Sequence, residues 1–214
     1  QKTAYEIRPR DWSSDVCSSD LAASAEELTA NVPELAVVAD IRAREHSRVN
    51  SAVIDTPTLF GLRDTLRAVL ADNAVSGAVV THGTATLEET AYLLDLTVGS
   101  DKPIVVTGAQ RDFDEKDADG PRNILYAAMI AADPHAAGRG VMVCVGGQIH
   151  AARYVVKADT LSLDAFGSRD GGKIGMVSKT GVTWFAHPRR SPHLEVDHVK
   201  QNVQLVVNTQ GAND

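Results

Sequence analysis

The chain has 214 residues, of which 43% are hydrophobic and 23% charged, and its formal net charge is -7 at pH 7. This length allows one large domain, or one domain and part of another, and the composition is that of a globular protein with a substantial core. The acidic balance argues against nucleic acid as a partner, since no basic cluster is longer than Arg189-Arg190. The apolar runs are far shorter than the ~20 residues that a transmembrane helix needs, so we expect a small-molecule partner and no membrane contact.

Residues 1–21 are expected to be a non-native leader. Residues 11–21, DWSSDVCSSDL, resemble the translation of a common sequencing-library adapter and show no usable periodicity. The alternative is a disordered leader rich in Ser and Asp, which the composition equally permits. If the adapter hypothesis holds, the native sequence begins near Ala22, and of the two cysteines only Cys144 remains. A lone cysteine in an apolar run indicates a buried small side chain rather than a disulfide, which favours a cytoplasmic location.

Beyond this leader, the first predicted elements are a short helix, a strand and a longer helix. Ser24 and Glu27 fit a capping box that opens the short helix. A strand is expected over residues 36–41, followed by a polar connection over residues 48–55, and Pro57 then opens the longer helix. The apolar residues of that helix share one broad face: Leu59, Phe60, Leu62, Leu66, Val69 and Leu70.

A short apolar run, a polar turn and a further helix follow within residues 77–95, GAVVTHGTATLEETAYLLD. Residues 78–80 favour a β-strand, whereas residues 87–98 carry apolar side chains at helical spacing. The turn at residues 81–85 therefore lies at the carboxyl end of a strand and before a helix N-terminus, which is where ligands bind in open α/β sheets. This position makes Thr84 a candidate functional side chain, although a lone threonine there is usually only a helix cap.

The residues around this turn predict how the helix begins. Thr86 and Glu89 fit a second capping box, with the Thr86 hydroxyl on the Glu89 amide, so the helix is expected to start at Leu87. His82, between the strand and the turn, has two interpretations, a general base or a structural residue hydrogen-bonded within the loop. We favour the structural one.

The alternation of elements continues in the next part of the chain. Residues 103–107, PIVVT, predict a strand, residues 121–132 a helix that opens on a proline, and residues 140–145 another strand. Strands that alternate with helices in this way indicate a parallel sheet with helices on both faces, a three-layer α/β fold. The connections are expected to be right-handed.

From Gln148 onward the pattern weakens, because the glycines within residues 167–175 break the chain and this region is expected to be irregular. A hairpin is predicted over residues 177–185. Residues 188–200 are expected to form a linker, and residues 201–214 contain a strand that begins a further domain. We therefore expect an N-terminal α/β domain over residues 22–187 that is truncated at both ends and lacks its first strand.

Several patterns that suggest metals or cofactors fail on closer inspection. Gly167, Gly172 and Lys173 have the spacing of a phosphate-binding P-loop, but Ile174 stands where that motif needs Ser or Thr, and no helix is predicted to follow. The seven His residues show no spacing suited to a metal. The acidic run at residues 112–119 lacks the glycine and the closing glutamate of a calcium loop. We expect neither a metal nor a cofactor.

Thr84 stands out through the segments that accompany it. THGTATLEETAYLLDLTV, followed by KPIVVTGAQR, DADGPRN and IHAARYVVK, closely resembles the asparaginase/glutaminase family of two-domain amidohydrolases. The resemblance covers residues 24 to about 175. It implies a parallel α/β N-terminal domain, a smaller C-terminal domain, and subunits that pair as a homo-oligomer to close the active site. The implied reaction is hydrolysis of the side-chain amide of asparagine or glutamine to a carboxylate and ammonia, without a cofactor.

The resemblance also implies roles for individual residues. Thr84 matches a threonine that positions or activates a nucleophile, and Lys157, in YVVK, matches the lysine that completes the charge network around it. Without the resemblance, Lys157 would be interpreted as a surface lysine. The implied substrate-binding residues are Ser51, Gly83, Ala85 and Ala109. The implied floor of the site contains Asp119, Gly120 and Asn123.

Two departures from the family pattern affect the expected activity. Ala85 stands where the family usually has an aspartate that anchors the substrate ammonium and balances Lys157. The Gly-rich motif that carries the attacking threonine has no match, and residues 11–21 stand in its place, so the covalent step is lost. We expect the chain as it stands to have little or no amidase activity. The alternatives are a non-catalytic small-molecule-binding module and a fragment that does not fold stably.

Overall fold

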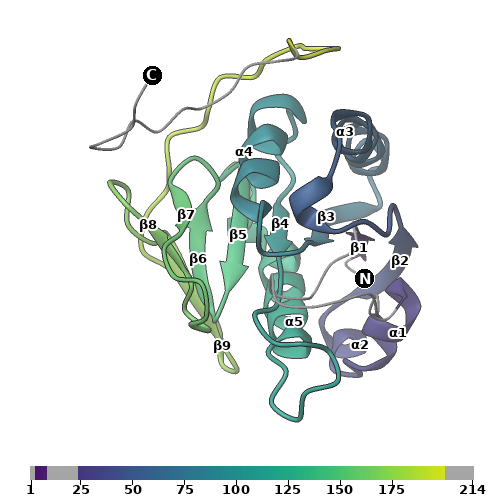
Figure 1. Ribbon diagram of the computed structural model, residues 1–214, viewed down its shortest axis with the longest axis vertical. Helices are drawn as coiled ribbons and strands as arrows, with labels where there is room; N and C mark the ends of the chain where they lie inside the picture. Colours follow the sequence, from purple (N-terminus) through teal and green to yellow (C-terminus); the bar gives the residue numbers. More distant parts are fainter. Residues whose placement is uncertain (1–2, 9–23, 201–214) are drawn as a thin grey trace, which may run out of the picture.

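The computed structural model of the chain describes residues 3–8 and 24–200 (Figure 1). One sheet has eight strands: β1 (Thr3–Arg8), β2 (Asp40–Glu45), β3 (Val75–Thr81), β4 (Ile104–Thr107), β5 (Val141–Val145), β6 (Gln148–Ala151), β9 (Gly175–Ser178) and β10 (Gly181–Trp184). A separate two-stranded ribbon contains β7 (Val155–Lys157) and β8 (Phe166–Ser168). The helices are α1 (Ala25–Ala30), α2 (Leu35–Val38), α3 (Thr56–Leu70), α4 (Leu87–Thr97) and α5 (Gly120–Ala132), with short 3-10 helices η1 (Ser51–Val53) and η2 (Pro134–Ala136).

The strands of the sheet lie in the order β10-β9-β6-β5-β4-β3-β1-β2. From β5 to β2 all neighbours are parallel, whereas β6, β9 and β10 extend the sheet with antiparallel pairs. The predicted α/β class with a largely parallel sheet is confirmed. The hairpin expected over residues 177–185 is also confirmed, since β9 and β10 pair antiparallel.

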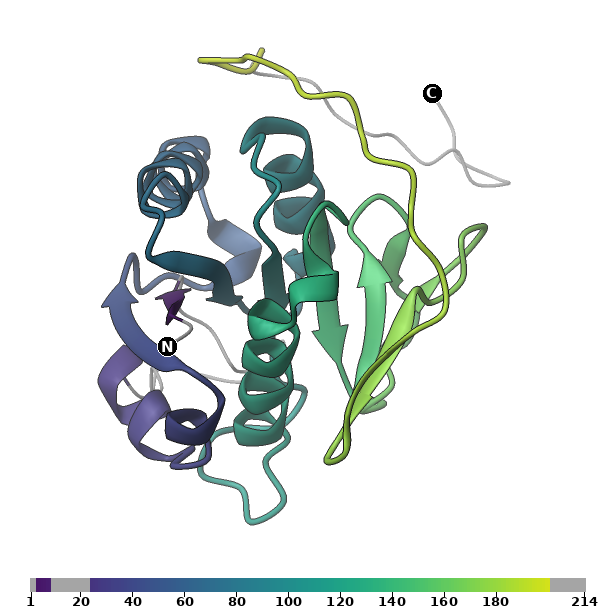
Figure 2. The same cartoon turned by 180° about the vertical axis from the view of Figure 1, so that it is seen from behind.

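Helices cover both faces of the sheet, and Figures 1 and 2 show α3 and α4 above it and α1, α2 and α5 below it. The buried apolar side chains form two clusters, one with each helical layer. Along β3, Ala78 and Val80 belong to the cluster with α3 and α4, whereas Val79 belongs to the cluster with α5, as the alternation of a strand requires. Because both faces of this strand are buried, its end is fixed by packing on two sides.

The expected strand over residues 36–41 is wrong in its position. The structure has α2 there, and β2 begins only at Asp40. Val37 is 90% exposed, so this apolar run does not form a buried strand. The Leu35 N–H instead donates to the Val32 carbonyl at 3.0 Å and closes a turn. Local backbone bonding thus outweighs the β preference of adjacent valines.

The region after β5, expected to be irregular, contains β6, β7 and β8. Gly146 and Gly147 have φ of +61° and +79°, which is the backbone of a two-residue hairpin turn between β5 and β6. Gly167 and Gly175, which predict breaks, lie within β8 and β9. A Cβ on Gly175 would lie 2.7 Å from the Thr183 carbonyl oxygen, so glycine there permits close approach of two strands rather than a break.

β1 lies within residues 1–21, where the sequence predicts a non-native leader. Its backbone pairs in parallel with β2 on one side and β3 on the other, so the expectation that the sheet lacks its first strand is wrong. The foreign origin of residues 1–21 stays a hypothesis. Residues 11–21, which resemble the adapter, and residues 201–214, with their expected strand, lie outside the described residues.

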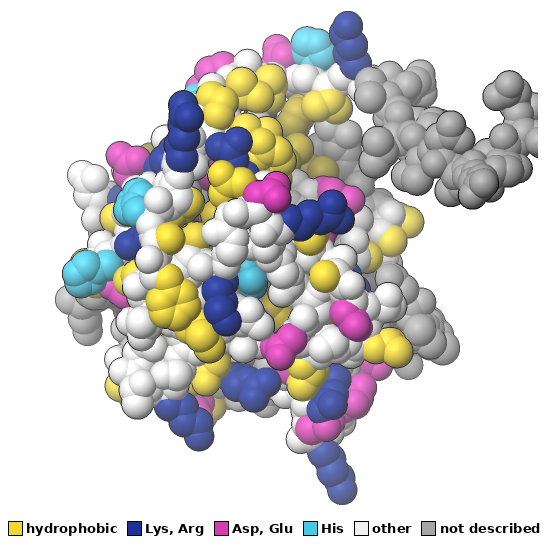
Figure 3. Space-filling view, turned by 90° about the vertical axis from the view of Figure 1, so that its left-hand side faces the viewer, with side chains coloured by type: hydrophobic (Ala, Val, Ile, Leu, Met, Phe, Trp, Pro, Cys, Tyr) yellow, Lys and Arg dark blue, Asp and Glu magenta, His cyan; other side chains and the backbone are white. Residues whose placement is uncertain are grey.

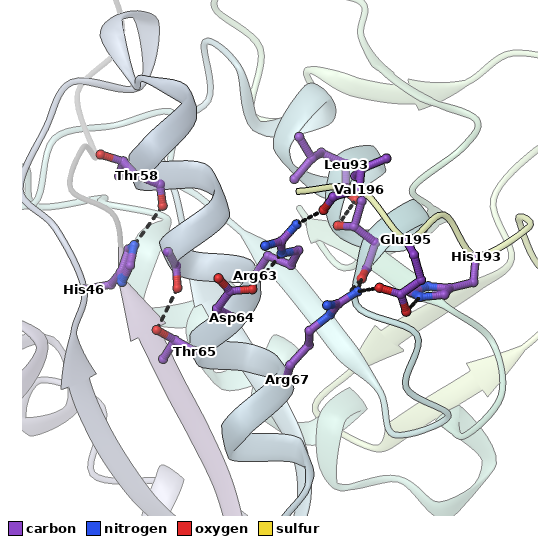
Figure 4. Close-up of polar contacts among 12 residues, drawn as sticks. His46, Thr58, Arg63, Asp64, Thr65, Arg67, Leu93, His193, Glu195 and Val196 are labelled. Carbon is purple, nitrogen blue, oxygen red and sulfur yellow. Dashed lines mark hydrogen bonds and ion pairs between the residues drawn. The ribbon is translucent and has the colours of Figure 1, made fainter. Parts of the chain in front are cut away.

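Residues 188–200 contain no helix or strand and pass across α3 and α4 (Figure 4). Arg63 on α3 donates to the Val196 carbonyl, and Arg67, one turn further along the helix, pairs with the Glu195 carboxylate at 3.1 Å. Two arginines of one helix face thus hold this segment against the upper helical layer. Its role as a linker to a further domain stays a prediction.

Candidate active site

Thr84 lies in the turn that joins β3 to α4, and only 2% of its surface is exposed. The pairing of β3 with β4 continues to Thr81 and Thr107, and beyond it the His82 N–H donates to the Thr107 carbonyl at 2.8 Å. The turn is therefore fixed at the carboxyl end of the parallel strands, which is where the sequence predicts it and where ligands bind in such sheets.

Both ring nitrogens of His82 lie within hydrogen-bonding distance of a partner in or near this turn. Nδ1 is 2.7 Å from the carbonyl oxygen of the buried Gly83, and Nε2 is 2.9 Å from the Thr90 hydroxyl on α4. The imidazole thus links the turn to the helix that follows. This arrangement supports the structural interpretation of His82 over a role as a base.

α4 begins at Leu87, as predicted, but it has no capping box. The Thr86 hydroxyl donates to the Ser51 carbonyl at 2.7 Å instead of accepting from the Glu89 N–H. With φ of -129° and ψ of 22°, Thr86 lacks the extended backbone that aims an N-cap side chain at the helix. This hydrogen bond holds Ser51, which lies in η1 and is 3% exposed, against Thr86 and therefore close to Ala85.

Lys157, at the end of β7, reaches Thr84 across 73 residues of sequence. Its Nζ donates to the Thr84 Oγ1 at 3.0 Å, so the structure brings the two predicted catalytic side chains together. The Lys157 backbone N–H donates to the Glu88 carboxylate in the first turn of α4. Among the residues that the structure describes, no carboxylate oxygen lies within 4.0 Å of the Lys157 Nζ, and Ala85 supplies none.

A pocket of about 180 Å³ opens beside this pair, lined by Ala85, Lys157, Ala158, Asp159 and Thr160. Its volume is below the roughly 300–1,000 Å³ typical of pockets for drug-sized ligands, so it suits a molecule with few heavy atoms. Two backbone N–H groups of the following loop bond to the exposed Asp159 carboxylate and lower its pKa. Lys157 and the acidic Asp159 therefore both line the pocket.

Ala109 lies in the loop after β4, which packs against the turn that holds Thr84. A Cβ on the adjacent Gly108 would lie 2.5 Å from the His82 carbonyl oxygen and 3.2 Å from the Thr84 Cγ2. The Asn123 Nδ2 donates to the Gly108 carbonyl at 2.9 Å and holds this loop from α5. Glycine at this position allows the two loops to touch, and Ala109 is buried beside their contact.

Asp119 organises the loop that the resemblance identifies as the floor of the site. Its carboxylate accepts from the backbone N–H groups of Gln110 and Arg111, each at 3.1 Å, and from the Asn123 side chain at 3.0 Å. The Asn123 Oδ1 accepts from the Gly146 N–H at 3.1 Å. These two buried side chains therefore join the β4 loop, α5 and the β5–β6 turn.

Three side chains that the sequence does not single out hold the ribbon that carries Lys157. Glu88 accepts the Lys157 N–H, as described above. The Gln110 Nε2 donates to two carbonyls of the β7–β8 loop, each at 3.1 Å. The His150 Nδ1 lies 2.8 Å from the Ser168 hydroxyl on β8. The sequence offers one signal for these contacts, the position of Glu88 in the first turn of a helix. The capping-box pattern instead draws attention to the neighbouring Glu89.

Burial changes the ionisation of two core side chains near the ribbon. It lowers the pKa of His150 to about 4, with the nearby Lys173 adding to the effect, so the ring is neutral at pH 7. It raises the pKa of the Cys144 thiol to about 12, which fits the predicted role of Cys144 as a buried small side chain.

The described residues show few features of a metal site, a membrane span or a charged binding surface. Residues 3–8 and 24–200 contain no group of three or more His, Cys, Asp or Glu that could hold a metal ion. None of the described helices combines the length and the apolar character needed to cross a bilayer. On the face shown in Figure 3, basic and acidic side chains are interspersed rather than gathered by sign.

Comparisons with known proteins identify the family of the chain. Residues 12–190 match the family described as "Asparaginase, N-terminal". The chain is 42% identical over 153 residues to L-asparaginase 2 of Bacillus subtilis (strain 168), a match that covers 72% of this chain and 41% of that protein. It is 36% identical over 165 residues to a probable periplasmic L-asparaginase of Haemophilus influenzae, which covers 77% of this chain and 47% of that protein.

A solved structure has the same fold. The crystal structure of a probable cytoplasmic L-asparaginase from Campylobacter jejuni matches with a TM-score of 0.82 at 31% sequence identity, over 90% of this chain and 60% of that chain. The chain spans about half the length of the curated relatives it matches. Since the N-terminal family match extends over most of its residues, the chain belongs to the asparaginase family.

Proposed function

We propose that the intact protein hydrolyses the side-chain amide of asparagine or glutamine to a carboxylate and ammonia. The observation that supports this is the 3.0 Å contact of the Lys157 Nζ with the Thr84 Oγ1 beside a small pocket. In its neutral form the lysine amine accepts the proton of a threonine or a water as that oxygen attacks the amide carbon. General base catalysis of this kind is typically worth about 10²–10⁴ in rate. The C–N bond then breaks, and the nitrogen leaves as ammonia with a proton returned by the lysine. Where a threonine has attacked, a water then cleaves the resulting ester, which releases the carboxylate and restores the threonine hydroxyl.

The attacking threonine that the resemblance implies has no match in this chain. We propose that Thr84 and Lys157 serve a nucleophile that the 214-residue chain does not supply, and that this chain alone has little or no amidase activity. Covalent catalysis needs an activated nucleophile within hydrogen-bonding reach of its base, so the base alone does not suffice.

Four residues are proposed to contact the substrate: Ser51, Gly83, Ala85 and Ala109. Ser51, Gly83 and Ala109 are buried, and hydrogen bonds or close packing hold their backbones next to the Thr84 turn. Ala85 lines the pocket but offers no charge to a substrate ammonium. We therefore propose that an acid from elsewhere, in the same chain or in a partner subunit of a homo-oligomer, binds that group.

The test is ammonia release from asparagine and glutamine by two proteins. One is the 214-residue chain, and the other is the same chain extended with the upstream and downstream coding sequence of its source DNA. The extended protein is expected to turn over, and Thr84→Val or Lys157→Met is expected to lower its kcat by about 10²–10⁴. Robust turnover by the 214-residue chain contradicts its proposed inactivity, and no ammonia from the extended protein contradicts the amidase.

Ala85 favours a second candidate, a non-catalytic module that binds a small amino-acid amide. Calorimetry on the extended protein distinguishes the two functions, because a binding module shows heat of binding for asparagine without ammonia release. The compartment is a separate proposal: we propose the cytoplasm, while the names of the relatives include both a cytoplasmic and a periplasmic asparaginase. Fractionation of source cells with an antibody to this chain tests it.

A further inference from the structure

We propose that Glu88 is a positioning residue of the site: its carboxylate holds the backbone of Lys157 so that the Lys157 Nζ stays on Thr84. The catalytic consequence of this contact rests on the proposed amidase function, whereas the contact itself does not. Glu88 lies in the first turn of α4, four residues after Thr84. The same short segment therefore presents both partners of Lys157.

The contact joins two elements that are far apart in sequence. The Lys157 backbone N–H donates to the Glu88 Oε2 across 69 residues. Glu88 is half-buried, and a carboxylate in a first helical turn is favoured by the partial positive charge of the helix N-terminus. A hydrogen bond to an ionised acceptor is shorter and roughly twice as strong as one between neutral groups. Glu88 is thus placed to hold the strand firmly.

The ribbon that carries Lys157 needs such a support. β7 and β8 have 3 residues each and pair only with one another, outside the eight-stranded sheet. A two-stranded ribbon alone is marginally stable in water. Lys157 is paired in register with Phe166 on one side of β7, and its own N–H points to α4 on the other. The free edge of the ribbon at this residue is therefore closed by Glu88.

The other two side chains form their hydrogen bonds with ribbon residues other than Lys157. Gln110 bonds to carbonyls of the β7–β8 loop, and His150 lies against Ser168 on β8. Both can keep the ribbon in place while β7 shifts relative to α4. Among the described residues, Glu88 is the one side chain that bonds to the backbone of the residue that bears the amine.

The lysine side chain makes this backbone contact important. Lysine has a flexible four-carbon stem, and ordering it costs rotamer freedom. Ala85 provides no carboxylate that could hold the Nζ directly, so the position of the Nζ depends on Thr84 at one end and on the backbone at the other. A shift of about 1 Å at a catalytic group can cost about 10²-fold in rate.

The first test measures amide hydrogen exchange of the Lys157 N–H by NMR on the 214-residue chain. Glu88→Met keeps the side-chain length and the helix preference but removes the oxygen acceptor, and it is expected to speed this exchange about tenfold or more. Glu88→Gln keeps an acceptor and is expected to preserve most of the protection. Glu89→Ala is the matched control, because Glu89 is exposed on the same helical turn and makes no hydrogen bond to the ribbon. Unchanged exchange in Glu88→Met, or equal acceleration in Glu89→Ala, overturns the proposal.

The second test uses ammonia release by the extended protein. Glu88→Met is expected to lower kcat about 10- to 100-fold with KM changed less than about threefold, and Glu88→Gln to recover most of kcat. A loss equal in Glu88→Gln and Glu88→Met points to the charge rather than to the backbone contact and overturns the positioning role. If the unaltered extended protein releases no ammonia, the proposed amidase fails, while the hydrogen-exchange result still decides the role of Glu88.

Discussion

Thr84 and Lys157 meet at 3.0 Å, yet different forces hold the elements that carry them. Thr84 follows a strand that is buried between two apolar clusters, and it is 2% exposed. Lys157 ends a strand of a separate two-stranded ribbon and is half-buried. Polar side chains from three other elements fasten that ribbon, each by one or two hydrogen bonds.

This difference has a consequence for how the site opens. Burial of apolar surface contributes about 25 cal/mol per Å², so the strand that ends at the Thr84 turn is stabilised by the two clusters against which it packs. A single internal hydrogen bond contributes about 0.5–1.5 kcal/mol net, so the ribbon can open locally with a much smaller free energy. The Lys157 half of the site is thus the half that small changes can shift.

The largest effect is expected from the core beneath Thr84. Leu94 on α4 is fully buried in the cluster shared with β3, and Leu94→Ala is expected to lower the free energy of unfolding by about 2–5 kcal/mol. Leu161→Ala, in the ribbon loop, is the control, since Leu161 is 78% exposed and its loss is expected to cost less than about 0.5 kcal/mol. Urea denaturation measures both. Equal effects of the two substitutions contradict the proposed difference between the Thr84 turn, which core packing holds, and the ribbon, which hydrogen bonds hold.

A titration tests the burial of His150, the β6 side chain that lies against the ribbon. The pKa of His150 is about 4 in the folded protein against 6.5 for the ordinary side chain, so the unfolded chain binds a proton first as the pH falls. The contribution of the neutral His150 is therefore complete above about pH 6.5 and declines by about 3 kcal/mol down to pH 4, below which it stays level.

The measurement compares unfolding free energies from pH 8 to pH 4 in the unaltered chain and in His150→Gln, because carboxylates also titrate at the acid end. The difference between the two curves isolates His150. If the unfolding free energies of the unaltered chain and of His150→Gln change by the same amount with pH, His150 is not a buried neutral ring.

A smaller and local effect is expected from Gln110. Loss of its two bonds to the β7–β8 loop is expected to cost about 1–2 kcal/mol, because the freed carbonyls lie on exposed residues and regain water. Gln110→Met keeps the side-chain length, adds no buried charge and removes the donors, so it is the sharper variant. Limited proteolysis is expected to cut residues 158–164 about tenfold faster, with little change in the global unfolding midpoint. An unaltered cleavage rate shows that the loop does not depend on Gln110.

Local signals account for what the sequence predicts correctly. The capping box of Ser24 and Glu27 opens α1 as expected, because both partners lie within one helical turn. Short, continuous apolar runs identify β3, β4 and β5, whose residues are buried on both faces. The position of Thr84 could be predicted from the sequence for this reason, because Thr84 lies between the end of a strand and the start of a helix.

The features that the sequence does not predict depend on contacts between elements that are far apart along the chain. The amine of Lys157 reaches Thr84 across 73 residues, and neither spacing nor periodicity contains that information, so only the family resemblance identified it. Glu88 and Glu89 are equivalent in sequence, and the fold decides which of them meets the ribbon. Propensity also failed at α2, where backbone turns replace the strand that two valines favour.

Thr86 gives the smallest and most specific test, because the sequence and the structure assign different partners to its hydroxyl. Thr86→Val keeps the shape and removes the bond to the Ser51 carbonyl, at an expected cost of about 1 kcal/mol. If the hydroxyl capped α4, its loss would speed hydrogen exchange of the Glu89 N–H. The structure instead predicts unchanged exchange at Glu89 and faster exchange in η1, where the released backbone carries Ser51. Since the packed core holds Thr84 without this bond, the substitution is expected to loosen the proposed substrate-binding serine while the proposed catalytic threonine stays in place.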